Sequence, residues 1–252
     1  HAQYFDFSLP QGGIRHDTPF WTGPAVFATL RNPRILDAVE SLIGPEVYSN
    51  PVQHVRLKPP ERLTPVDATT GAVQLGATPW HQDNGVIRDE ADESDIVTVW
   101  FPLTDATIEN GCLAVVPFSH RDALLPHCPA NVENRSRFAF HIKERFFAAG
   151  EAVPLPMTRG SALFLTKRTV HCSLSNTSDH VRFSFDLRYN PTGQPTGRGM
   201  FPGFVARSRS HPETELRDPE AWMAMWLEAR RALADGEQPS FNRWDPASPA
   251  CA

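Results

Sequence analysis

The sequence lacks any run of roughly 18 or more apolar residues, the length that a membrane-spanning helix needs. No membrane span is therefore predicted. Basic residues are not in excess either, because the formal net charge is −5. Proteins that bind nucleic acids are usually basic, so we expect no nucleic-acid partner. The first residues, HAQYFDFSLPQ, show no basic segment followed by an apolar core, and no signal peptide is predicted.

Cysteine is scarce and follows no recognisable pattern. The four cysteines, Cys112, Cys128, Cys172 and Cys251, include no C-x-x-C pair. Neither a disulfide framework nor a zinc ribbon is predicted from this spacing. A reducing environment is then the default expectation, and we predict a cytoplasmic location.

No internal repeat or low-complexity linker divides the chain. Its 252 residues are enough for one large domain with a full core, so we expect a single domain over residues 1–252. Proline and glycine are abundant, at 24 and 15 residues, and much of the chain is therefore expected to be loop. The oligomeric state is not readable from these features.

Two segments have the apolar spacing of helices. Residues 33–44 carry apolar side chains at helical intervals and end at Gly44, a plausible stop. Residues 219–234 begin with Pro219 in the first turn. The periodicity predicts that one face of this C-terminal helix packs on the rest of the domain, and it consists of Trp222, Met225, Trp226 and Ala229.

The middle of the chain is typical of β structure. Short runs rich in β-branched and aromatic residues are separated by turn signals such as Asn110-Gly111. We expect strands at residues 52–58, 95–101, 112–116, 161–166 and 181–189. Short strands in this arrangement favour a sandwich or a barrel, so the fold class is expected to be mainly β with flanking helices.

The triplet His81-Gln82-Asp83 is the main candidate for a metal site. In an extended segment residues i and i+2 point to the same side, so His81 and Asp83 can present a nitrogen and an oxygen to one ion. Two histidines and one carboxylate leave open positions on the metal, as in non-haem Fe(II) oxygenases. Such a triplet also arises by chance, and it needs a third ligand from elsewhere.

The third ligand is not fixed by the residues alone. His171 is favoured by its position directly after the expected strand 161–166. The candidates are His1, His16, His54, His120, His127, His141, His171, His180 and His211.

Arg182 lies eleven residues after His171, within the alternating strand 181–189. It shares one face with Ser184, Asp186 and Arg188, and an arginine on such a face can hold a carboxylate through two hydrogen bonds. The alternative is that this polar face is simply solvated.

Thr98 and Trp100 share one face of the expected strand 95–101. Thr98 is placed to hydrogen-bond the carboxylate of a co-substrate, and Trp100 to wall the cavity. The alternative, ordinary β-branched and aromatic core residues, has equal support from composition.

These motifs together resemble the phytanoyl-CoA dioxygenase (PhyH-like) family of 2-oxoglutarate oxygenases. The resemblance rests on residues 80–83, on the segment 98–113, on residues 116–120, and on the spacing of His171 and Arg182. It covers roughly residues 20–205, and the combination is far more specific than any single motif. One departure is Phe118, where the family more often has glycine.

The resemblance implies a fold and a metal centre. The fold would be a double-stranded β-helix, a jelly-roll or cupin-like barrel, with its core at about residues 45–205 and the helix at about 219–234 packed on it. Fe(II) would be held by His81, Asp83 and His171. Arg182 would pair with the distal carboxylate of the co-substrate 2-oxoglutarate.

Further positions match co-substrate contacts of the family. Ser173, two residues after the distal histidine, is expected to help bind 2-oxoglutarate, with Thr98 and Trp100 close to it. Gln53, on the strand before the metal motif, is expected to line the same pocket. His120 falls in the family's Ser-His turn and is expected to be structural.

The implied activity is a dioxygenase reaction with O2, releasing succinate and CO2. Related halogenases replace the metal carboxylate with a small residue, whereas this sequence keeps Asp83. Hydroxylation or a related oxidation of an unactivated C–H bond is therefore expected, on a small organic substrate that we predict to be a specialised metabolite. The alternatives are a cupin-like metal enzyme that is not an oxygenase, and a catalytically silent module that binds 2-oxoglutarate.

Features around the expected pocket bear on the substrate. The segment 84–95 carries five acidic residues, and segments 61–79 and 190–203 are long and irregular. Each is placed to form part of the mouth, although a charged run is more often a solvated loop. Arg188, Arg198 and Arg207 are candidates to meet an anionic substrate, or are solvated.

Overall fold

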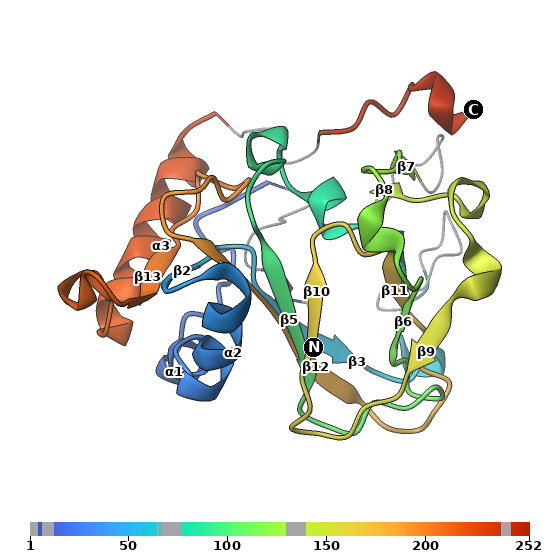
Figure 1. Ribbon diagram of the computed structural model, residues 1–252, viewed down its shortest axis with the longest axis horizontal. Coiled ribbons are helices and arrows are strands. Elements are labelled where there is room, and N and C mark those ends of the chain that lie inside the picture. Colours follow the sequence, from blue (N-terminus) through green and yellow to red (C-terminus); the bar gives the residue numbers. More distant parts are fainter. Residues whose placement is uncertain (1–4, 7–12, 65, 67–76, 130–139, 238–242) are drawn as a thin grey trace.

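Two antiparallel sheets form the centre of the molecule, with the helices on the outer side of the larger sheet (Figure 1). This computed structural model describes residues 5–6, 13–64, 66, 77–129, 140–237 and 243–252. The larger sheet has seven strands: β1 (Phe5–Asp6), β2 (Glu46–Ser49), β3 (His54–Lys58), β5 (Val97–Pro102), β10 (Leu163–Thr166), β12 (Arg182–Pro191) and β13 (Phe204–Ser208). The smaller has four strands: β4 (Thr78–His81), β6 (Leu113–Val115), β9 (Val153–Leu155) and β11 (His171–Ser173). β7 (Cys128–Pro129) pairs separately with β8 (Phe140–His141).

The predicted strands are all present, as β3, β5, β6, β10 and β12. The prediction of a mainly β chain with flanking helices is therefore confirmed. β12 is the longest strand, and it pairs along its length with β3, β5 and β2. Both predicted helices are also present, as α2 (Pro33–Ile43) and α3 (Pro219–Asp235), together with α1 (Pro24–Leu30).

The helix starts follow from the local sequence. All three helices carry proline at their first position, where the missing N–H costs no hydrogen bond. The side chain of Asn32 caps α2 by accepting the backbone N–H of Arg34, and Asp218 caps α3 through Glu220. Gly44 ends α2 with φ of 93°, a conformation that glycine adopts without strain.

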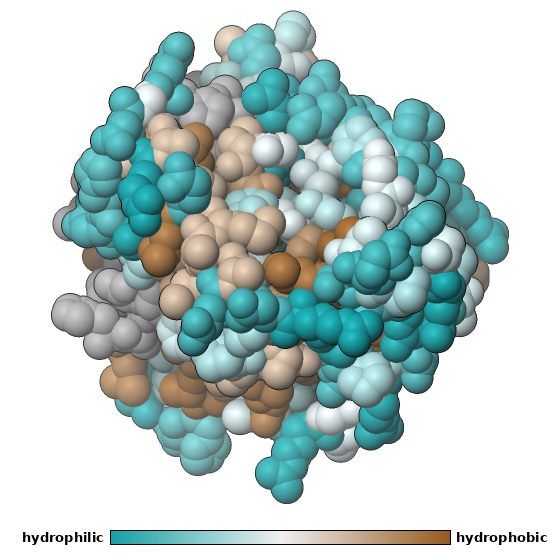
Figure 2. Space-filling model, turned by 90° about the vertical axis from the view of Figure 1, so that its left-hand side faces the viewer, coloured by the Kyte–Doolittle hydropathy of each residue, from teal (hydrophilic) through white to brown (hydrophobic). Residues whose placement is uncertain are grey.

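The main core lies between the helices and one face of the seven-stranded sheet. Trp222 and Trp226 of α3 are buried there, as predicted. Met225 was expected on the same face, but its side chain is 38% exposed, so that part of the prediction is wrong. Each residue advances a helix by about 100°. Met225 is therefore turned about 100° away from Trp226, and the core contacts only the face that carries the two tryptophans. Figure 2 shows this flank, with less polar residues at its centre and hydrophilic ones around them.

β12 separates this core from a polar interior. Phe185, Leu187 and Tyr189 point into the main core. The other face carries Arg182, Ser184, Asp186 and Arg188, which are all buried. The alternative of a solvated polar face is therefore wrong, because the four-stranded sheet covers this side of β12.

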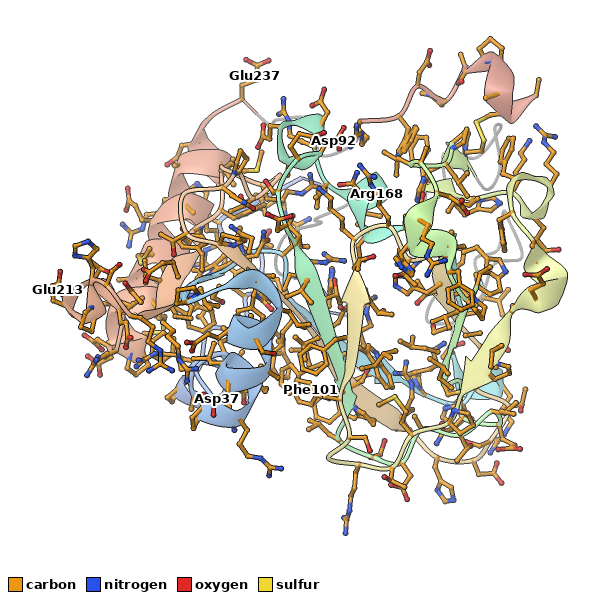
Figure 3. The ribbon with its side chains drawn as sticks, in the orientation of Figure 1. Asp37, Asp92, Phe101, Arg168, Glu213 and Glu237 are labelled. Carbon is orange, nitrogen blue, oxygen red and sulfur yellow. A yellow bond between two sulfur atoms is a disulfide. The ribbon has the colours of Figure 1, made fainter. Side chains whose placement is uncertain are left out.

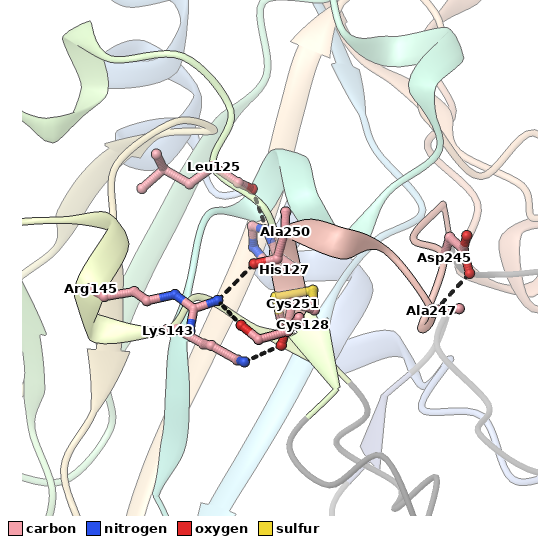
Figure 4. Close-up of a disulfide and its surroundings, with 10 residues drawn as sticks. Leu125, His127, Cys128, Lys143, Arg145, Asp245, Ala247, Ala250 and Cys251 are labelled. Carbon is pink, nitrogen blue, oxygen red and sulfur yellow. Dashed lines mark hydrogen bonds between the residues drawn. A yellow bond between two sulfur atoms is a disulfide. The ribbon is translucent and has the colours of Figure 1, made fainter.

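Cys128 of β7 and Cys251 form a disulfide, with their Cα atoms 5.3 Å apart (Figure 4). The prediction of no disulfide is thus wrong for this pair. The two cysteines are 123 residues apart in sequence, so no local spacing pattern predicts the bond. Cys112 and Cys172 are free and buried.

No helix among the described residues combines the length and the apolar character needed to cross a membrane. The cytoplasmic location stays a prediction.

Candidate metal centre

His81 and His171 are brought together by strand pairing. β4 and β11 run antiparallel, and the two histidines occupy directly opposite positions in the register. Their ring centroids are 4.2 Å apart. Asp83 follows β4 at the start of a short 3-10 turn, Asp83–Val86. The three side chains are buried, and one ligand atom from each lies within 4.8 Å of the others, so together they can hold a metal ion.

The hydrogen bonds of the two imidazoles prepare them for a metal. His81 Nδ1 lies 2.8 Å from the carbonyl oxygen of Pro79, and His171 Nδ1 lies 2.9 Å from that of Thr169. A carbonyl only accepts hydrogen bonds, so each Nδ1 carries the proton and each Nε2 keeps a lone pair. Burial lowers the pKa of His81 well below its usual range, which keeps this ring neutral.

Asp83 is oriented from both sides. Thr98 donates its hydroxyl hydrogen to one carboxylate oxygen at 2.5 Å, and Arg188 donates to the other. Burial would raise the pKa of Asp83, but the charge of Arg188 and the Thr98 hydrogen bond lower it overall. The carboxylate is therefore ionised, as a metal ligand must be.

A cavity between the two sheets adjoins these histidines. Its lining comes from strands of both sheets, which places it at the polar face of β12. The lining residues are Arg56, Thr78, His81, Trp100, Leu113, Leu165, His171, Cys172, Ser173, Arg182 and Asp186.

Arg182 is the cation of this cavity that has no carboxylate partner among the described residues. Its Nη1 donates to Ser184 at 2.7 Å, and its guanidinium carbon lies 5.5 Å from the centre of the Trp100 ring. Two buried donors, Arg182 Nε and Trp100 Nε1, have no hydrogen-bond partner among the residues that the structure describes. Burial lowers the pKa of Arg182 to about 10, still far above neutrality. A positive charge and two unused donors thus adjoin the cavity.

Asp186 and Arg56 form an ion pair at 3.0 Å within the same lining. Ser173 also lines the cavity, and its hydroxyl oxygen accepts hydrogen bonds from Lys58 at 2.7 Å and from the backbone of Thr78 at 3.0 Å. The hydroxyl hydrogen of Ser173 remains available as a donor.

Two predicted co-substrate residues lie elsewhere. Thr98 contacts the metal carboxylate Asp83 and is absent from the cavity lining. Gln53 does not line the cavity either: its side-chain oxygen accepts the backbone N–H of Arg188 at 3.1 Å, and its amide nitrogen donates to the Arg188 carbonyl at 3.1 Å. Gln53 therefore fixes the backbone beneath Arg188. His120 is exposed, and its structural role stays a prediction.

Lys58 and Arg56 lie near the site and were not assigned a role in it from sequence. Arg188 was considered only for an anionic substrate, whereas the structure places it on Asp83. The sequence signal for Lys58 and Arg56 is the alternation along β3. His54, Arg56 and Lys58 recur at every second position, and each lies opposite a residue of the polar face of β12. Only the register between the strands shows which of these polar groups meet.

The arginines considered for an anionic substrate are held by protein groups. Arg198 donates to the carbonyl of Val86, and Arg207 pairs with Asp37 and Glu40 at 2.7 Å each. The acidic segment after Asp83 is also tied down, because Lys167 donates to the carbonyls of Ala91, Asp92 and Ser94.

The sequence profile of the phytanoyl-CoA dioxygenase (PhyH) family matches residues 12–184. The chain belongs to this family. The resemblance predicted from the motifs is therefore confirmed, and the matched range includes His81, Asp83, His171 and Arg182. A probable phytanoyl-CoA dioxygenase of Caenorhabditis elegans is 26% identical over 188 residues, or 73% of this chain and 56% of that protein. This PhyH chain spans about half the length of the curated relatives it matches.

Two solved structures are similar to this PhyH protein. EvdO2 from Micromonospora carbonacea var. aurantiaca, complexed with 2-oxoglutarate, has a TM-score of 0.52 and 26% identity, and the match covers 67% of this chain and 64% of EvdO2. The non-heme monooxygenase ThoJ has a TM-score of 0.58 and 22% identity, over 81% of this chain and 75% of ThoJ. The second likeness concerns the fold alone.

Proposed function

We propose that this PhyH protein is an Fe(II)- and 2-oxoglutarate-dependent oxygenase. The observation that carries the proposal is the convergence of His81, Asp83 and His171 beside a cavity whose unpaired cation is Arg182. The similarity to EvdO2 complexed with 2-oxoglutarate supports the same conclusion.

His81, Asp83 and His171 would hold Fe(II). Two neutral imidazoles and one carboxylate are the ligand set of non-haem Fe(II) oxygenases, which leaves positions open for other ligands. The donor chemistry fits this ion, because both Nε2 atoms keep their lone pairs and Asp83 is ionised. Thr98 and Arg188 would hold the carboxylate in place.

Arg182 would anchor the distal carboxylate of 2-oxoglutarate, with Ser173 as a further donor. The unused donors Arg182 Nε and Trp100 Nε1 need acceptors, and a buried donor without a partner costs about 1–3 kcal/mol. A carboxylate supplies several acceptor sites in one group. Trp100, beneath the guanidinium, keeps it from turning away.

Iron, 2-oxoglutarate and O2 would supply the oxidation of an unactivated C–H bond, with release of succinate and CO2. The protein's own contribution is orientation, together with the exclusion of water between the two sheets. We propose that these sheets are the walls of a double-stranded β-helix within a single domain. We also propose hydroxylation as the reaction and a small organic molecule, a specialised metabolite, as the substrate.

The test is an anaerobic absorption titration of the metal-free protein with Fe(II) and then with 2-oxoglutarate. A broad visible charge-transfer band that appears only with both, and that is lost in Arg182→Gln, is the expected result. Iron binding without this band would instead favour a cupin-like metal enzyme that is not an oxygenase. Absence of iron binding would favour a silent module and contradict the proposal.

A further inference from the structure

The last described segment of the chain lies against the turn that carries Asp83. We call residues 243–252 the C-terminal strap and residues 82–85 the metal turn. The indole N–H of Trp244 donates to the carbonyl of Gly85 at 2.6 Å. Arg243 donates to Asp92 through two nitrogens, at 2.6 and 2.7 Å, and to the carbonyl of Asn84 at 3.3 Å. The strap therefore holds the backbone directly after the ligand Asp83.

Asp92 links this contact to the metal turn a second time. Its carboxylate accepts the side-chain amide of Asn84 at 3.0 Å as well as the guanidinium of Arg243. Figure 3 labels Asp92 at the top of the view, the side along which the last described segment also runs. The pKa of Asp92 is lowered, first by its hydrogen bonds with Arg243, so the pair is charged at neutral pH.

His127 connects the strap to Gln82, the residue between His81 and Asp83. Its Nε2 accepts the backbone N–H of Gln82 at 3.1 Å, and its Nδ1 lies 2.9 Å from the carbonyl of Leu125. Its ring stacks on Trp244, with centroids 5.0 Å apart and planes 18° apart. Burial lowers the pKa of His127 to about 4, so the neutral ring remains an acceptor.

Gly85 leaves the space that the His127 ring fills. A Cβ atom added at Gly85 would lie only 2.1 Å from that ring. The metal turn, His127 and Trp244 are thus closely packed. A displacement of the strap would therefore displace the metal turn as well.

The disulfide joins the strap to the segment that carries His127. Cys128 follows His127 in sequence and is bonded to Cys251 of the strap (Figure 4). Lys143 donates to the Cys251 carbonyl, and Arg145 to that of Ala250 at 2.8 Å. The disulfide closes a loop between the strap and residue 128, and so raises the effective concentration of these contacts.

We propose that the disulfide-locked strap positions the metal turn, so that reduction of Cys128–Cys251 weakens metal binding at His81, Asp83 and His171. The inference rests on the proposed metal site. Reduction by a dithiol breaks the S–S bond, leaves a thiol on each cysteine, and oxidises the reductant to its own disulfide, so electrons and protons balance. Groups that support metal ligands typically change metal affinity by about 10- to 100-fold, and we expect about a tenfold loss.

The experiment is an anaerobic titration of metal-free protein with Co(II), followed by visible absorption. The variant Cys128→Ser/Cys251→Ser removes the bond and adds no thiol that binds cobalt. Its dissociation constant for Co(II) should be about ten times that of the wild-type protein. Trp244→Ala should give a similar loss, and Trp244→Phe, which keeps the stacking partner of His127, a smaller one.

Leu36→Ala is the matched control, because it truncates a buried residue of α2 in the main core. It should lower the unfolding temperature without changing the Co(II) dissociation constant. A general loss of stability would instead weaken Co(II) binding in all variants alike. Wild-type affinity in the double serine variant would overturn the inference and leave the metal site standing. No Co(II) binding in the wild-type protein would refute the proposed metal site itself.

Discussion

The guanidinium carbon of Arg182 lies 5.5 Å from the centre of the Trp100 indole ring, and both side chains line the cavity. The planar guanidinium is thereby held against a ring, and its Nε has no hydrogen-bond partner in the described part of the chain. This arrangement distinguishes arginine from lysine, because an ammonium group has neither the flat face nor the paired donors.

Arg182→Lys is therefore expected to weaken 2-oxoglutarate binding. The loss of a bidentate, charge-assisted contact, at about 1.5–3 kcal/mol, corresponds to about 10- to 100-fold in the dissociation constant. The measurement is an anaerobic titration of the Fe(II) protein with 2-oxoglutarate. Arg209→Gln, which changes a 60% exposed arginine side chain, is the control and should bind normally. Unchanged binding in Arg182→Lys would remove Arg182 from the co-substrate site.

Arg188→Gln should give the opposite pattern. Arg188 contacts Asp83 and is absent from the cavity lining, so its loss should weaken metal binding by about 10-fold or more and leave the 2-oxoglutarate affinity of the metal-loaded protein nearly unchanged. Metal titration and co-substrate titration of the same variant separate the two effects. A selective loss of 2-oxoglutarate binding would mean that Arg188, and not Arg182, holds the co-substrate.

Asp83→Ala is expected to abolish metal-dependent turnover, since one of three ligands is lost. It should also lower the free energy of unfolding by about 3–5 kcal/mol, because Arg188 is left buried without its carboxylate. Succinate production and urea unfolding measure the two effects. Asp83→Asn keeps the shape and one of the two acceptor oxygens, and should unfold at a higher urea concentration than Asp83→Ala. Full activity in Asp83→Ala would contradict the proposed iron ligation.

Phe118→Gly is expected to stabilise the protein by about 0.5–1 kcal/mol. Phe118 is the one non-glycine residue of the described segments with a positive φ, 65°, and the residue is 67% exposed. A left-handed residue with a side chain costs about 1–2 kcal/mol, which exceeds the entropy that glycine adds to the unfolded chain. Urea unfolding tests this, with Phe118→Ala as the comparison. The alanine variant keeps the strain and loses the ring contact with Arg121, so equal stabilisation by both would refute the backbone explanation.

Lys58 is expected to make stability depend on pH. Burial, and then the charges of Arg182 and Arg56, lower the pKa of Lys58 from 10.5 to about 7. Between these values the unfolded chain binds more protons than the folded protein, so stability rises with pH from about 7 upward. The wild-type free energy of unfolding, minus that of Lys58→Met, should rise by at most about 1.4 kcal/mol per pH unit from pH 7 to 9. A flat difference in urea unfolding would show that Lys58 keeps its ordinary pKa.

Sequence patterns predicted the elements whose signal is local. The helix at 33–44 and the strands around β3, β5, β10 and β12 were found because their apolar spacing lies within one segment. β4 and β11 were not predicted as strands. Their sequences, TPWH and HCS, lack the apolar runs of β10 and β6, LFLT and LAV. They form because their neighbours in the sheet supply hydrogen bonds.

The sequence by itself determined the family, because its motifs are local. His81 and Asp83 followed from one triplet, and His171 was chosen among the other histidines through the resemblance to that family. Tertiary structure alone decided that Thr98 and Arg188 both donate hydrogen bonds to the Asp83 carboxylate, and that Cys128 is bonded to Cys251. These partners are separated by 15, 105 and 123 residues. Contacts at such separations depend on strand register and on the packing of distant segments, which no local spacing encodes.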